Sequence, residues 1–170
     1  MKRREVLLAS VAMGLTANKP IKAASEQQSA EPFDTFRKKF QISSLLVQEF
    51  RYWSWSVRPV QSTLGAGILS LKRPVPDWAD VSAQENAELS IAVGALEKRL
   101  RRRFAYDKIN YLMLMMIDPY VHFHVLPRYS KDKSFQGQVW HDHGWPGAPD
   151  LGGTESPHNL LRDLQLELKR

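Results

Sequence analysis

The stretch YVHFHVLPR at positions 120–128 decides the fold expected for this chain of 170 residues. Side chains alternate between the two faces of a β-strand, so Tyr120, His122 and His124 are expected to share one face. The apolar residues between them are expected on the opposite face, against a core. Histidine titrates near neutral pH, so the two neighbouring imidazoles indicate a nucleophile, a proton carrier or a pair of metal ligands.

An apolar segment at residues 109–117 precedes this stretch and predicts a strand buried on both faces. Asp118-Pro119 then predicts a turn, because proline lacks an N–H and favours turn conformations. The methionines of the segment are predicted to fill the core: Met113, Met115 and Met116. The histidines would therefore begin a second strand directly after a central one, near the end of a sheet, where a pocket can form.

The 120–128 stretch resembles the signature of the histidine triad (HIT) family of nucleotidyl hydrolases and transferases, His-φ-His-φ-His-φ-φ, where φ is apolar. The middle histidine of the family corresponds to His122 and the last to His124, whereas Tyr120 stands at the first position. The resemblance implies that His122 attacks the α-phosphate of a nucleotide and that His124 hydrogen-bonds the phosphoryl oxygen or the leaving group. A neutral imidazole is a competent nucleophile, and this route requires no metal or other cofactor.

The resemblance covers roughly residues 45–130 and implies an α+β fold, an antiparallel sheet of about five strands with a long helix on one face. Three short strands are predicted before that helix: 45–50, 53–59 and 64–71. Ser82 and Glu85 form a capping-box pattern, and it predicts that the long helix spans 82–104.

Four further residues are expected to bind the substrate by this resemblance: Tyr120, Asn110, Ser56 and Arg128. Tyr120 can donate a hydrogen bond in place of the missing histidine, but it cannot become a cation at neutral pH. Asn110 and Ser56 lie where family members carry polar residues toward the site. The alternative for both is an ordinary polar residue on a strand.

Three functions remain open from the sequence. The first is hydrolysis or transfer of a nucleotidyl group from a phosphoanhydride or phosphoramidate, through a nucleotidyl-histidine intermediate. The second is nucleotide binding with little or no catalysis, because the triad is incomplete at Tyr120. The third is metal binding by two His-x-His pairs, since His141 and His143 repeat the pattern in a loop.

The chain is expected to consist of a signal peptide or disordered arm at 1–30, a HIT-like domain at 31–130, and a C-terminal loop and amphipathic helix at 131–170. Lys2-Arg3-Arg4 is followed by an apolar run that is too short to span a bilayer. This start is similar to a twin-arginine signal and predicts export to the periplasm. A cytoplasmic location is the alternative.

The formal charge of +6 does not indicate a nucleic-acid partner. Residues 1–24 carry +4 of it, which leaves +2 on the rest of the chain. The expected partner is the nucleotide substrate, and no stable membrane span is predicted. The HIT resemblance also implies a homodimer.

Overall fold

The computed structural model describes residues 32–170, so the predicted signal at 1–30 lies outside the described residues. Residues 32–39 are helical. The elements after them are β1 Leu46–Glu49, β2 Trp53–Val57, β3 Gly67–Leu71, η1 Trp78–Asp80, α2 Ala83–Phe104, β4 Lys108–Leu112, β5 His122–Arg128, β6 Lys133–Phe135, β7 Gln138–Trp140 and α3 His158–Lys169. None of the helices described in residues 32–170 is long and apolar enough to cross a bilayer.

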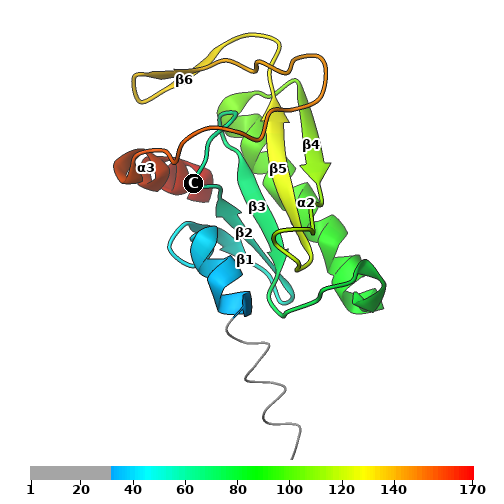
Figure 1. Ribbon diagram of the computed structural model, residues 1–170. Helices are drawn as coiled ribbons and strands as arrows, with labels where there is room; N and C mark the ends of the chain where they lie inside the picture. Colours follow the sequence, from blue (N-terminus) through cyan, green and yellow to red (C-terminus); the bar gives the residue numbers. More distant parts are fainter. Residues whose placement is uncertain (1–31) are drawn as a thin grey trace, which may run out of the picture.

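Five strands form one antiparallel sheet in the order β1-β2-β3-β5-β4 (Figure 1). This confirms the predicted α+β fold. The long helix α2 begins as predicted, because the Ser82 hydroxyl accepts the Glu85 N–H at 3.3 Å and the Glu85 carboxylate accepts the Ser82 N–H at 2.8 Å. Figure 1 shows α2 behind the sheet, in green.

The main core lies between the sheet, α2 and α3. Leu96 and Leu100 of α2 are fully buried there, at helical spacing. The predicted C-terminal amphipathic helix is present as α3, which packs on β1 and β2 and buries Leu161 and Leu164 in the same core. The 131–170 segment therefore closes one end of this core.

Strand β4 lies at the edge of the sheet, so the prediction of a strand at 109–117 buried on both faces is wrong. Only Lys108–Leu112 pairs with β5, and the apolar residues after it form the connection. Met113 and Met116 are 39% and 93% exposed, so the core role predicted for them is also wrong, whereas Met115 is half-buried against the core. The prediction failed because apolar composition does not distinguish an interior strand from an exposed apolar surface.

A two-stranded hairpin of β6 and β7 stands in the segment that the sequence predicts to be a loop. Gln136 and Gly137 connect the strands with φ angles of 49° and 76°, as a two-residue type I′ turn requires. Gly137 was the local signal for this turn.

Candidate functional site

The two motif histidines project from β5, which lies between β3 and β4. His122 pairs with Ser70 and His124 pairs with Ile68, so the imidazoles share the sheet face that does not contact α2. Val125, one residue further along, lies in the main core as the alternation predicts. His122 is fully buried and His124 is 6% exposed.

Hydrogen bonds identify which nitrogen of each neutral imidazole carries the proton. The Nδ1 atom of His122 lies 2.7 Å from the carbonyl oxygen of Tyr120. A carbonyl oxygen only accepts, so Nδ1 carries the proton and Nε2 carries the free lone pair. The Nε2–H of His124 then donates to His122 Nε2 at 3.3 Å. This leaves His124 Nδ1 as a buried acceptor without a hydrogen-bond partner among residues 32–170.

Burial keeps both imidazoles neutral. Desolvation lowers the pKa of His122, and the opposing interactions with the Tyr120 carbonyl and Asp118 are weaker. Desolvation, followed by the effects of His122 and Arg58, lowers the pKa of His124 to about 4. At neutral pH the pair therefore presents the lone pair of His122 Nε2, which accepts the His124 N–H, and the lone pair of His124 Nδ1, which has no partner among residues 32–170.

These depressed pKa values predict a pH-dependent stability. An unfolded histidine binds a proton near pH 6.5, whereas folded His124 does so only near pH 4, so the free energy of unfolding falls as the pH drops through this window. The slope is at most about 1.4 kcal/mol per pH unit for each histidine. Urea denaturation at several pH values between 6.5 and 4.5 measures this slope. These pH values lie above the range in which Glu85, whose pKa is lowered to about 2, contributes most to the pH dependence of stability.

A matched pair of variants tests this origin of the slope. His124→Asn is expected to flatten the pH dependence, and His143→Asn, at an exposed histidine, is expected to leave it unchanged. An unchanged slope in His124→Asn would contradict the assignment of a neutral, buried imidazole.

A cluster of aromatic rings covers the histidines. The ring of Phe36 lies 5.1 Å from that of His122, and the ring of Phe40 lies 5.5 Å from His122 and 5.6 Å from His124. Phe36 and Phe40 are buried in one cluster with Tyr120, which is 8% exposed. The two phenylalanines belong to the 32–39 helix and the turn that follows it, so this segment separates the imidazoles from solvent.

The predicted substrate residues fall into two groups. Tyr120 lies beside the histidines, and Ser56 shares their sheet face, because it pairs with Ile68, which in turn pairs with His124. Two strand spacings, roughly 10 Å, separate Ser56 from His124. The Ser56 hydroxyl is buried and has no hydrogen-bond partner in the described part of the chain.

Asn110 and Arg128 form the second group, in a network of their own. Arg128 is 3% exposed and its guanidinium binds both carboxylate oxygens of Asp142, at 2.6 and 2.9 Å. It also donates to Asn110 Oδ1 at 2.8 Å and to the Gly147 carbonyl at 3.1 Å. Among residues 32–170, no hydrogen bond or ion pair joins this network to the histidine pair.

The second His-x-His pair lies on the surface after β7. The His141 and His143 rings are 5.8 Å apart, and His141 Nδ1 lies 2.7 Å from an Asp132 carboxylate oxygen. In the described range, 32–170, no group of three or more histidine and carboxylate side chains is placed to hold a metal ion. The structure therefore does not bring the two pairs together as one metal site.

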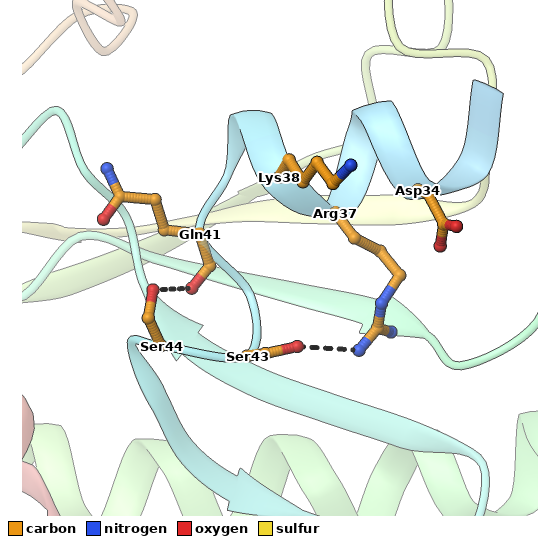
Figure 2. Close-up of a pocket in the computed structure, with 6 residues that line it drawn as sticks. All are labelled: Asp34, Arg37, Lys38, Gln41, Ser43 and Ser44. Atoms are coloured by element: carbon orange, nitrogen blue, oxygen red, sulfur yellow. Dashed lines mark hydrogen bonds between the residues drawn. The ribbon is translucent and has the colours of Figure 1, made fainter. Parts of the chain in front are cut away.

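A separate depression of about 440 Å³ lies on the outer side of the 32–39 helix. Polar side chains of the helix and of the following turn line it: Asp34, Arg37, Lys38, Gln41, Ser43 and Ser44 (Figure 2). Figure 2 shows Arg37 pointing to Ser43, to whose hydroxyl it donates at 3.2 Å. Neither histidine of β5 lines this depression, so it lies apart from the candidate site.

Three residues at the site were not found from the sequence: Phe36, Phe40 and Arg58. Phe36 and Phe40 recur at helical spacing, which signals a buried helix face. That signal does not show which sheet face the helix covers. Arg58 follows β2 and gives no sequence pattern at all.

No protein-family model and no curated protein sequence matches the chain. Its fold is similar to that of solved histidine triad structures. A histidine triad protein from Sinorhizobium meliloti has 16% identity and a TM-score of 0.59, over 75% of this chain and 90% of that one. A Hit-like protein involved in cell-cycle regulation from Bartonella henselae has 15% identity and a TM-score of 0.58, over 80% and 90%. A hypothetical histidine triad nucleotide-binding protein from Sulfolobus tokodaii has 15% identity and a TM-score of 0.54, over 74% and 80%. The chain therefore has the histidine triad fold.

Proposed function

We propose that this protein hydrolyses or transfers the nucleotidyl group of a nucleotide phosphoanhydride or phosphoramidate. The observation that carries the proposal is the orientation of His122, whose Nδ1–H donates to the Tyr120 carbonyl, so that its nucleophilic lone pair is on Nε2, where it accepts the His124 N–H. The nucleotide class is supported by the shared fold, since the similar Sulfolobus protein is described as nucleotide-binding.

The chemistry proceeds in two displacements. Nε2 of His122 attacks the α-phosphorus, and the new P–N bond forms as the bond to the leaving group breaks. The Nε2–H of His124, released from His122, hydrogen-bonds a phosphoryl oxygen or the leaving atom as negative charge develops there. Water or another acceptor then attacks phosphorus and gives its proton to solvent, while the P–N bond breaks and restores the neutral His122.

The other polar residues take two kinds of role in this proposal. Tyr120 and Ser56 face the nucleotide as hydrogen-bonding hydroxyls. Arg128 and Asn110, which are joined to each other and to the loop at Asp142, hold the end of β5 in position. Because phenyl rings cover both histidines, the 32–39 helix and its following turn must shift before a nucleotide reaches them.

The covering of both histidines by phenyl rings is also the observation that favours a second function, nucleotide binding without turnover. A site closed by Phe36 and Phe40, with a phenol at the first triad position, is compatible with a protein that holds a nucleotide near the histidines and does not cleave it.

Incubation with adenosine phosphoramidate and with diadenosine polyphosphates, in the presence of EDTA, separates the two functions. We expect release of AMP and a labelled, acid-labile nucleotidyl-protein from substrate carrying ³²P at the α-phosphate, because phosphoramidate bonds to histidine break in acid. Nucleotide binding without AMP release would favour the second function. AMP release that requires added metal would contradict the metal-free route.

We further propose a homodimer that pairs through the edge of β4. Apolar side chains beside this edge are exposed: Met113, Leu114, Met116 and Ile117. Sedimentation analysis tests the proposal, and a mass near 19.5 kDa, that of a single chain, would refute it.

We also retain the proposal that residues 1–30 act as an export signal, which rests on the twin-arginine-like pattern at Arg3-Arg4. Mass spectrometry of the N-terminus, after expression with and without a twin-arginine pathway, tests it. An intact N-terminus on protein that stays in the cytoplasm would refute it.

A further inference from the structure

Arg58, directly after β2, is a buried cation with no carboxylate partner in the described part of the chain. Its side chain donates to the Val60 carbonyl at 2.8 Å, to the Leu151 carbonyl at 2.9 Å and weakly to the Ser62 hydroxyl at 3.4 Å. The residue is only 8% exposed, and its Nε–H is buried with no hydrogen-bond partner among residues 32–170.

Comparison with Arg128 shows what is unusual about Arg58. Both arginine residues are more than nine-tenths buried, but Arg128 binds Asp142 in a bidentate ion pair. Arg58 forms no ion pair with any residue that the structure describes, and Asp150 acts on it only at longer range. A buried charge is costly unless an opposite charge and hydrogen bonds compensate it, so the site at Arg58 is electrostatically incomplete.

The side chain of Arg58 lines a cavity of about 180 Å³ beside the histidine pair. The cavity walls come from the 32–39 helix, its following turn, the end of β2 and the loop before α3: Lys39, Phe40, Arg58, Pro59, Val60 and Glu155. The same Phe40 ring that borders this cavity also packs on His124 at 5.6 Å. This ring therefore lies between the cavity and His124.

The charges and size of the cavity indicate the kind of ligand. Arg58 contributes a cation, whereas the Lys39 ammonium already binds both carboxylate oxygens of Asp118 at 2.7 Å, and the Glu155 carboxylate is hydrogen-bonded to the Gln41 amide. A volume of about 180 Å³ is below the roughly 300–1,000 Å³ of sites that enclose a drug-sized molecule. It accommodates a phosphate-sized anion, for which Arg58 supplies the positive charge, while its Nη1 and Nη2 atoms also donate to the Val60 and Leu151 carbonyls.

We propose that Arg58 binds a phosphate-type oxyanion in this cavity and thereby holds the part of a substrate that lies beyond the phosphate attacked by His122. This inference rests on the proposed function and deepens it. It makes Arg58 a specificity-determining residue, because a dinucleoside polyphosphate has such a phosphate and adenosine phosphoramidate does not.

Calorimetric titration of the full chain with pyrophosphate tests the binding step. We expect Arg58→Gln to weaken pyrophosphate binding about 10-fold or more, since hydrogen bonds to charged groups contribute roughly 1.5–3 kcal/mol. Lys39→Gln, which removes a cation already paired with Asp118, is expected to weaken it less than Arg58→Gln does. The matched control is Arg37→Gln, which removes a cation from the same helix at the separate depression of Figure 2 and should not change the affinity.

Two nucleotides identify the source of the anion. Tighter binding of ADP than of AMP, lost in Arg58→Gln, assigns the cavity to a nucleotide's own terminal phosphate. Pyrophosphate binding that depends on Arg58, without any preference for ADP, assigns it to a free anion. Wild-type protein that binds none of these, or Arg58→Gln protein that binds them as wild type does, overturns the proposal.

Turnover separates this proposal from the proposed function. Arg58→Gln should lower kcat/KM for a diadenosine polyphosphate about 10-fold and leave that for adenosine phosphoramidate unchanged. Equal loss on both substrates overturns the specificity role while the proposed function stands. Absence of turnover on either substrate refutes the proposed function, and the pyrophosphate titration then still decides the anion site. If Arg58→Gln does not fold, because Val60 and Leu151 lose their donor, Arg58→Lys provides the same comparison.

Discussion

The His122→Ala variant is expected to release AMP at least about 10,000-fold more slowly than the wild type, because removal of a covalent nucleophile costs rate losses of this order or larger. His122 presents the only imidazole nitrogen of the pair whose lone pair faces the other ring, with its Nδ1 held by the Tyr120 carbonyl. Steady-state assays on adenosine phosphoramidate measure the loss, and no labelled nucleotidyl-protein should form.

Two further variants make this result interpretable. His143→Ala removes an exposed histidine and should keep full activity. His124→Ala should reduce turnover by less than His122→Ala does, because His124 donates a hydrogen bond and does not form the covalent bond. Undiminished AMP release by His122→Ala would refute the proposed nucleophile, whatever the effect of the other variants.

The Asp142→Ala variant is expected to lose about 3–5 kcal/mol of stability, the usual cost of leaving one member of a buried ion pair without its partner. The side chains of Arg128 and Asp142 are 3% and 2% exposed, so water cannot replace the lost carboxylate without rearrangement. Asp142 also accepts the Tyr129 N–H at 3.1 Å, and this donor would be orphaned as well. Urea denaturation followed by circular dichroism measures the change.

A double variant and a surface pair serve as controls for this effect. Arg128→Met combined with Asp142→Leu replaces both charges with apolar groups and should recover much of the lost stability. Arg170→Ala breaks the exposed pair with Glu167 and should change stability by less than about 1 kcal/mol. A cost of less than about 1 kcal/mol for Asp142→Ala would mean that the 141–147 loop does not depend on this ion pair.

Much of the fold could be predicted from local patterns. The alternation of polar and apolar residues in 120–128 correctly separated the histidine face from the core face, since the period of a strand is a property of the backbone itself. The capping box at Ser82 predicted the start of α2, because its hydrogen bonds join residues only three apart. The position of β4 at the edge could not be predicted, because strand order depends on pairings between distant segments.

For the candidate site, too, local patterns could be predicted and contacts between distant segments could not. By itself, the sequence determined the histidine pair, its position on one strand and the tyrosine at the first triad position, all of which follow from neighbouring residues in one extended segment. Only the tertiary structure decided that Phe36 and Phe40 cover the imidazoles, that Asp142 neutralises Arg128 and that Arg58 is buried without a counter-ion among residues 32–170. These features depend on contacts between segments far apart in the chain, such as Arg58 with Leu151, and only the packing of the sheet brings such segments together.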